Sequence, residues 1–164
     1  LHAARHHISI HLHEDPALFT KLSEKLEQIL QDLASNWTEL ERELQRFIEE
    51  ELKQGREQEI EGLDPKVQAP FFGLLKEAIE EASGQKLDGG ALRSAVGLTV
   101  EIVDHVKREI GHVGFWRDPP SRQRLENWVF RCLRRSRLIP NERVQELATR
   151  LVDLAKSRHR FLVT

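Results

Sequence analysis

Apolar side chains recur three and four positions apart along most of this chain, the spacing that places them on one face of an α-helix. After Asp15 these positions are Leu18, Leu22, Leu26, Ile29 and Leu33. After Asn36 they are Trp37, Leu40, Leu44 and Phe47, followed by the pair Glu51/Leu52 at the next position of the series. The alternation of threes and fours predicts a narrow apolar seam, as in an antiparallel pair of helices.

Aspartate followed by proline marks three helix starts. The pairs are Asp15-Pro16, Asp64-Pro65 and Asp118-Pro119. An aspartate carboxylate accepts hydrogen bonds from the free N–H groups of a first turn. Proline suits the first helical position because its missing N–H would have been unpaired there. Each pair therefore predicts a helix that begins there, and Pro140 predicts the start of the last long helix.

The second half of the chain continues the helical pattern. The apolar positions after Asp64 are Val67, Phe71, Leu74, Leu75 and Ile79. Glycine-containing breaks at 83–84 and 88–90 precede a long helix. That helix carries Leu92, Val96, Thr99, Val103, Val106, Ile110 and Val113. The last two helices carry Leu125, Trp128, Val129, Cys132 and Leu133, then Val144, Leu147, Ala148, Leu151 and Val152.

The first dozen residues fit two patterns. Ala4, Ile8 and Leu12 fit a helix, whereas Ile8, Ile10 and Leu12 alternate with polar residues as in a strand. We favour the helix because a lone strand has no visible partner. The sequence thus predicts an all-α fold, a bundle of six or seven helices that forms a single domain over residues 1–164. Residues 54–62, charged and glycine-containing, are the expected mobile loop.

Composition narrows the class of protein further. Hydrophobic residues make up 39% and charged residues 32% of the 164, a balance that argues against a disordered chain. The chain contains no methionine and begins at Leu1, so we expect it to be a C-terminal piece of a longer polypeptide. Neither a membrane-length apolar run nor a signal peptide is visible. Cys132, the single cysteine, falls at an apolar helical position and is expected in the core; one cysteine is compatible with the reducing cytoplasm.

Charge is distributed unevenly, although the net charge is only −2. Residues 1–90 hold 10 Lys and Arg against 19 Asp and Glu, a charge of −9. Residues 91–164 hold 15 against 8, a charge of +7. Two such halves can neutralise each other by packing together, or they can present opposite charges to different partners.

Arginines gather on the predicted helix after Asp118. The candidate DNA- or partner-binding residues are Arg122, Arg124, Arg131, Arg134, Arg135 and Arg137. At ~100° per residue, Arg124, Arg131 and Arg135 form one stripe opposite the apolar face of the helix. A guanidinium pairs with phosphate through a two-pronged set of N–H groups, so the stripe could contact a nucleic-acid backbone. It could equally contact a protein partner, or be a solvated face or one paired with the acidic helix that follows Asn36.

Other candidate sites carry weaker signals. His2 and His6, and His7 and His11, are spaced to chelate a metal on a helix, but no matching third ligand lies in that cluster, so no metal site is assigned. The sequence also lacks a phosphate-binding glycine loop and a nucleophile elbow, and we assign no catalytic residue. Trp37, Trp116 and Trp128 are expected in the core, with Phe115 and Trp116 as the candidate anchors of an interface.

Two blocks of the sequence resemble the C-terminal helical region of the restriction (R) subunit of type I restriction–modification enzymes. One block runs from Arg5-His6-His7-Ile8 to Ile29-Leu30. The other runs from Val113-Gly114-Phe115-Trp116-Arg117 through Leu138-Ile139-Pro140 to Leu154-Ala155-Lys156. Its most distinctive string is Gly114-Phe115-Trp116-Arg117-Asp118-Pro119. The acidic middle and the glycine-containing segment match least.

The resemblance implies a parent polypeptide that uses ATP to translocate DNA and Mg²⁺ to cleave it, with both activities upstream of Leu1. It also implies that this region docks onto the methyltransferase and specificity subunits, and that it needs no cofactor itself. We therefore expect an assembly domain of a type I restriction endonuclease that acts in the cytoplasm and could touch DNA through the arginine stripe. The alternatives are a stand-alone helical module that binds the DNA backbone and a scaffold module of another large enzyme.

Overall fold

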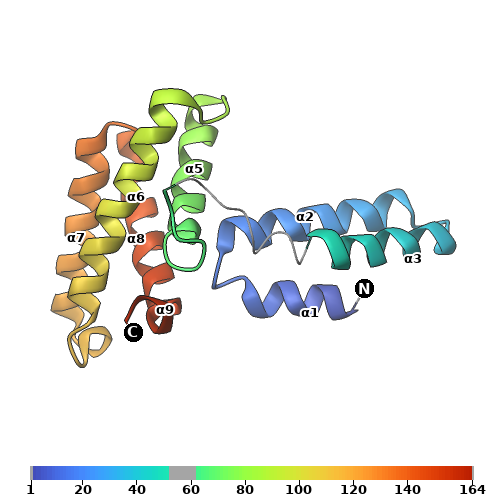
Figure 1. Ribbon diagram of the computed structural model, residues 1–164, viewed down its shortest axis with the longest axis horizontal. Coiled ribbons are helices and arrows are strands. Elements are labelled where there is room, and N and C mark those ends of the chain that lie inside the picture. Colours follow the sequence, from blue (N-terminus) through green and yellow to red (C-terminus); the bar gives the residue numbers. More distant parts are fainter. Residues whose placement is uncertain (1, 52–61, 164) are drawn as a thin grey trace. The chain divides into compact units, whose positions relative to one another are not determined.

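Helices account for nearly all of the regular structure, as the apolar spacing predicts. The computed structural model describes residues 2–51 and 62–163, and within these ranges it contains eight α-helices and no strand. The all-α prediction is confirmed. The chain divides into two compact units, residues 1–59 and residues 60–164 (Figure 1).

The described part of unit 1, residues 2–51, consists of three helices and one π-helical turn. These are α1 (His2–His11), α2 (Pro16–Asp32), α3 (Trp37–Arg46) and η1 (Phe47–Glu51). α1 packs on α2, and α2 packs on α3, beside which it lies in Figure 1. The core consists of Ala4, Ile8, Phe19, Leu22, Leu26 and Phe47. The side chain of Asp15 accepts from the backbone N–H of Leu18, so the predicted cap of α2 is confirmed. The side chain of Asn36 caps α3 in the same way by accepting from the N–H of Glu39.

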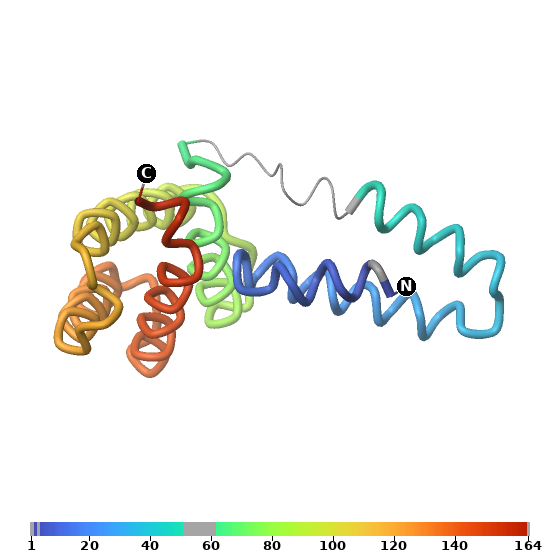
Figure 2. Tube along the Cα trace, turned by 90° about the horizontal axis from the view of Figure 1, so that it is seen from below, coloured from blue at the N-terminus to red at the C-terminus, as the bar shows by residue number. Residues whose placement is uncertain are grey.

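Unit 2 is a bundle of four long helices arranged in a ring. They are α5 (Ala69–Ser83), α6 (Gly89–Ile110), α7 (Pro119–Ser136) and α8 (Asn141–Ser157). α5 packs on α6, α6 on α7, α7 on α8, and α8 back on α5 (Figure 2). The 3₁₀ turn η2 (Phe115–Arg117) links α6 to α7, and the short α9 (His159–Leu162) follows α8. The ring encloses fully buried side chains from all four long helices, including Phe71, Ile102, Leu133 and Leu151.

Neighbouring helices of the ring run antiparallel. Arg122 of α7 contacts Asp153 of α8, and Glu126 of α7 contacts Thr149 of α8. The residue number therefore increases along α7 while the number of its partner decreases along α8. Short connections between consecutive helices favour this up-down arrangement, in which each helix returns beside the one before it. The C-terminal end of α7 and the N-terminal end of α8 therefore lie at the same end of the bundle.

Three predictions about local structure are wrong, and each has a local cause. Trp37 is 78% exposed, because it begins α3 just after the α2–α3 turn and no described residue covers it. Val113 is fully exposed, because α6 ends at Ile110. Asp64 accepts from the N–H groups of Lys66 and Val67 and so caps only an isolated turn; α5 itself begins at Ala69. Residues 54–61 of the expected mobile loop lie outside the described residues.

Candidate functional site

The string from Gly114 to Asp118 forms the corner that sets the direction of α7. Gly114 adopts a left-handed conformation, φ 78°, which glycine reaches without steric cost. Phe115 is buried in unit 2, and its ring lies at 88° to the indole of Trp116, with ring centroids 4.9 Å apart. Trp116 is half-buried and donates from Nε1 to Nδ1 of His159, 3.1 Å away, while Asp118 caps α7 through the N–H of Ser121. The two candidate interface residues therefore pack within their own unit.

Three of the six predicted arginines are engaged in polar contacts inside unit 2. Arg122 pairs with Asp153 of α8, and Arg135 pairs with Glu101 of α6, each with an N–O distance of 2.5 Å. Arg124 donates to the hydroxyl oxygen of Ser121 and lies 3.9 Å from the carboxylate of Asp118. All of these partners lie in unit 2.

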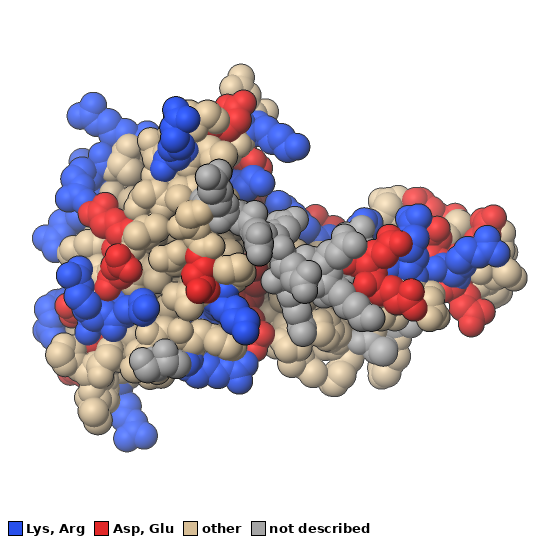
Figure 3. All heavy atoms as spheres, in the orientation of Figure 1, with Lys and Arg blue, Asp and Glu red and all other residues tan. Residues whose placement is uncertain are grey.

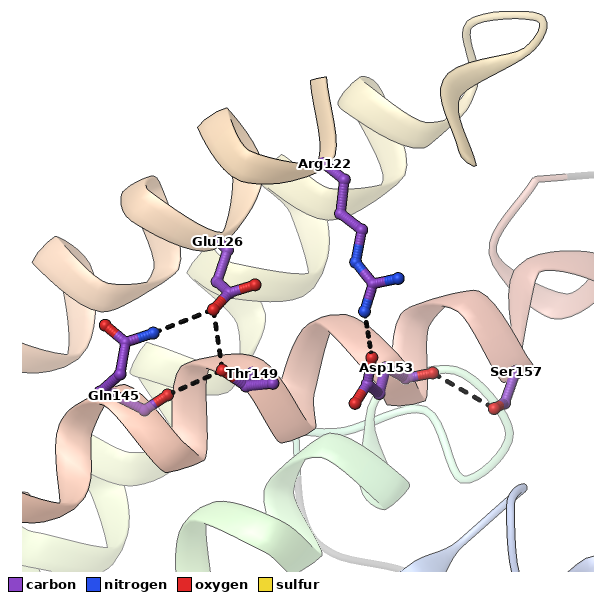
Figure 4. A network of polar contacts seen from close by, with 6 residues as sticks. All are labelled: Arg122, Glu126, Gln145, Thr149, Asp153 and Ser157. Atoms are coloured by element: carbon purple, nitrogen blue, oxygen red, sulfur yellow. Dashed lines mark hydrogen bonds and ion pairs between the residues drawn. The ribbon is translucent and has the colours of Figure 1, made fainter. Parts of the chain in front are cut away.

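The ion pair of Arg122 belongs to a polar seam between α7 and α8 (Figure 4). Glu126 accepts hydrogen bonds from Nε2 of Gln145 and from the hydroxyl of Thr149, at 2.9 and 2.8 Å. Arg122 and Glu126 lie one turn apart on α7, so the seam fixes the register of the two helices. Arg122, one of the six candidate arginines, is accordingly occupied by contacts that hold the bundle together.

The other three arginines lie at the C-terminal end of α7 and remain exposed. These are Arg131, Arg134 and Arg137, and the described part of the chain offers no ion pair or hydrogen bond to their side chains. With Arg135 they line one open hollow of about 720 Å³, whose remaining lining residues are Phe130, Ile139, Pro140 and Asn141. We call this feature the arginine hollow. Figure 3 shows basic side chains gathered along the side of unit 2 that carries α7.

The electrostatics of the arginine hollow are one-sided. The segment 127–141 carries four arginines and neither an aspartate nor a glutamate. Only Arg135 has a counter-charge, through Glu101. Clustered guanidinium groups repel one another, and a nearby anion offsets that repulsion. A concave surface with three unneutralised guanidinium groups therefore favours a negatively charged ligand.

Arg137 holds an unusual backbone conformation at the rim of the hollow. Its φ of 59° is left-handed, and among the described residues it is the only one besides glycines with a positive φ. Helices commonly end with such a residue, but glycine normally takes the position because any Cβ is crowded there. The hydroxyl of Ser136 supports the turn by donating to the carbonyl of Leu133 and accepting from the N–H of Leu138. An arginine side chain is thereby kept where a glycine would fit with less strain.

Cys132 is on α7, the helix that carries these arginines, and it is buried in the core, as the sequence predicts. Burial raises the pKa of its thiol to about 11, and the carboxylate of Glu101 adds to the effect, while Arg135 opposes it. The thiol therefore stays protonated at neutral pH and is a poor nucleophile.

The histidines of α1 form a small cluster with an aromatic neighbour. The rings of His7 and His11 are 4.5 Å apart, and both lie about 6 Å from the ring of Phe19. Nδ1 of His11 lies 2.9 Å from a carboxylate oxygen of Glu14. Within the residues that the structure describes, no group of three or more potential metal ligands comes together.

Two features of unit 2 were not singled out from the sequence. The imidazole of His105 on α6 stacks on the indole of Trp128 on α7, and the buried Arg158 donates to the backbone carbonyl of Lys66. The stack could have been found from helical register, since Trp128 lies on the apolar face of α7. The Arg158 contact joins residues 92 apart, and no local pattern indicates it.

Comparison with known proteins does not assign the chain to a family. No family model, curated protein or solved structure matches the chain. Within the described residues, no helix combines the length and apolarity that a membrane crossing requires.

Proposed function

We propose that this chain is a helical assembly domain of the kind found at the C-terminal end of type I restriction subunits. It docks the restriction subunit onto the methyltransferase and specificity subunits, and the arginine hollow contacts the backbone of the DNA that the complex holds. ATP hydrolysis, Mg²⁺-dependent cleavage and the cytoplasmic setting belong to the proposed parent enzyme, and the domain itself supplies binding.

The observation that carries the proposal is the unequal pairing of the α7 arginines. Arg122, Arg124 and Arg135 contact polar or acidic groups of unit 2 itself, as a purely structural role requires. Arg131, Arg134 and Arg137 instead converge on the arginine hollow without a partner from the described residues. Such an arrangement supports a role in binding an external anion, and DNA is the principal polyanion in a restriction complex.

The family resemblance supports the assembly role. Its first block falls in α1 and α2 of unit 1, and its second block covers the Gly114–Asp118 corner, α7 and α8 of unit 2. The corner precedes the N-terminal end of α7, the arginine hollow lies at the C-terminal end of the same helix, and the second block of the resemblance spans both. The second block therefore includes the helices that carry the arginine hollow, and the first block contributes to the core of unit 1.

The first test is capture of the 164-residue chain by a cognate complex of methyltransferase and specificity subunits, in the absence of DNA. The proposal expects capture by the complex. It also expects no ATPase or nuclease activity from the chain alone. A chain that folds but is not captured by the complex would overturn the docking role.

A stand-alone DNA-binding module is the second candidate function, and the same arginine hollow favours it. Such a module would bind DNA tightly by itself, with an affinity that falls steeply as salt rises. The two functions are separated by one comparison on the same preparation. Capture by the complex favours the assembly domain, whereas tight DNA binding without capture favours the independent module.

A further inference from the structure

We propose that the arginine hollow seats two or three consecutive phosphates of a nucleic-acid backbone, with Arg131, Arg134 and Arg137 as their ligands. The inference rests on the proposed function only in taking the arginine hollow as the binding surface. It adds the chemistry of the ligand, the number of its contacts and the residues that make them.

Spacing sets the number of phosphates. Arg131 and Arg134 are three residues apart on α7, and Arg137 follows three residues later, just past the end of the helix. At ~1.5 Å per residue the three positions span roughly 9 Å along the helix axis. Neighbouring phosphates of one DNA strand rise about 3.4 Å along the duplex axis, and their separation in space is larger because the strand also winds around that axis, so a span of roughly 9 Å matches two or three phosphates rather than one.

The type of cation favours phosphate. All four basic residues of the hollow are arginines, and the segment 127–141 contains no lysine. A guanidinium offers a planar fork of N–H donors that fits two oxygens of a phosphate at once, whereas an ammonium acts as a point charge. Arg135 is held by Glu101, which leaves the forks of the other three available to a ligand.

The rest of the lining fits the sugar that joins the phosphates. Phe130, Ile139 and Pro140 contribute an apolar wall beside the arginines. A deoxyribose presents C–H groups on either side of each phosphate, and these can lie against such a wall. The nearest acidic side chain in sequence, Glu142 in the first turn of α8, is not among the lining residues. Contacts to phosphate and sugar alone carry no base information, so the expected binding is independent of sequence.

The backbone of Arg137 provides independent support. A left-handed arginine is retained at a position where glycine would end the helix without strain. Strained positions that persist are concentrated at binding sites, where the side chain has a use that outweighs the strain. The arginine hollow supplies that use, because Arg137 is one of its lining residues.

The test measures the affinity of the 164-residue chain for a fluorescein-labelled 12-base-pair duplex between 50 and 200 mM NaCl. Three phosphate contacts predict an affinity that falls about 40-fold over this range, and two predict about 12-fold. Arg131→Gln, Arg134→Gln and Arg137→Gln should each reduce the salt slope by about one contact. Lys156→Gln, at the other end of α8, removes the same charge from an exposed position and should leave the slope unchanged.

Three competitors identify the ligand class. An unlabelled duplex of unrelated sequence should displace the probe fully, and inorganic phosphate should do so only at far higher concentration. Displacement by polyglutamate as effective as that by DNA would overturn the assignment to phosphate and indicate an acidic protein. Salt slopes that are the same for wild type and all three arginine variants would overturn the site.

Failure of this inference differs from failure of the proposed function. Capture of the chain by the methyltransferase and specificity subunits, with no measurable DNA affinity, would reject phosphate binding by the arginine hollow but not the docking role. Salt-dependent DNA binding through Arg134, without capture by the complex, would reject the docking role but not phosphate binding by the arginine hollow. Circular dichroism of each variant establishes that a lost affinity reflects the lost side chain rather than unfolding.

Discussion

The imidazole of His105 lies flat against the indole of Trp128, with ring centroids 3.7 Å apart and an angle of 12° between the planes. This stacking contact joins α6 to α7, the same two helices that the ion pair between Glu101 and Arg135 joins. Burial lowers the pKa of His105; the nearby carboxylate of Glu109 opposes this shift, and the guanidinium of Arg108 adds to it.

The lowered pKa makes unit 2 less stable in acid. Because His105 is held neutral in the fold, its contribution is present above the ordinary histidine pKa of 6.5 and is lost as the pH falls below that value. We expect the urea midpoint to decrease as the pH is lowered from 7 to 5. The imidazole resonances of His105, followed by NMR, should titrate with a midpoint below 6.5.

His105→Phe is the matched control, since phenylalanine keeps an aromatic ring on Trp128 and removes the titrating group. This variant should show a shallower decrease in the urea midpoint over the same pH range. An unchanged pH dependence in the variant would mean that other groups cause the acid sensitivity.

The raised pKa of Cys132 predicts a slowly reacting thiol. With a pKa of about 11 in place of the ordinary 9.0, alkylation by iodoacetamide at pH 8 should be at least about 100-fold slower than that of a free cysteine. The fold favours the protonated thiol, so the contribution of this group to stability is complete below pH 9 and is lost as the pH rises toward 11.

Glu101→Gln tests one cause of that shift, because it removes an anion beside the thiol. The variant should react faster than wild type at pH 8. Asp104→Asn, which neutralises an exposed carboxylate one turn along α6, should react as wild type does. Equal rates for both variants would show that burial alone protects the thiol.

Two arginines flank the ring of Phe161 and differ in burial. Arg158 is 6% exposed, donates to the carbonyl of Lys66 and lies 4.6 Å from the ring centroid; Arg160 is exposed and lies 4.7 Å from it. Arg158→Met leaves that carbonyl without its donor and should lower the free energy of unfolding by about 2–4 kcal/mol. Arg160→Met should cost no more than about 1 kcal/mol. Urea denaturation of the two variants measures the difference, and equal losses would contradict the structural role of Arg158.

Arg137→Gly should raise stability and weaken DNA binding. Glycine relieves the left-handed strain, which costs an ordinary residue ~1 kcal/mol, although it also makes the unfolded chain more flexible. We expect a net gain of about 0.5 kcal/mol or less in the free energy of unfolding. A loss of stability together with unchanged DNA affinity would show that Arg137 serves the helix end rather than a ligand.

Helix starts were predictable where the signal lies within one turn of sequence. Asp15, Asn36 and Asp118 each cap the helix that follows, and in each case the capping atom and its N–H partner belong to residues three positions apart. Trp37 shows the limit of this approach. Its spacing from Leu40 and Leu44 is helical, but only the three-dimensional position of the α2–α3 turn decides that no described residue covers it.

The candidate site was predictable in composition and not in geometry. Helical periodicity places Arg124, Arg131 and Arg135 on the outer face of α7, and the structure bears this out. The ion pairs of Arg122 and Arg135 join residues 31 and 34 positions apart, so spacing along α7 cannot separate paired from unpaired arginines. The arginine hollow also depends on the left-handed turn at Arg137, a conformation that an arginine rarely adopts.

The measurement that tests the central claim most directly is the affinity of the 164-residue chain for the cognate methyltransferase–specificity complex, by calorimetry, with and without bound DNA. The account predicts binding to the complex alone and tighter binding when DNA is present. It also predicts that Arg134→Gln reduces the gain from DNA without changing binding to the complex alone, and that Lys156→Gln retains the full gain. Absence of binding to the complex in both conditions, with a chain shown to be folded, would contradict the account.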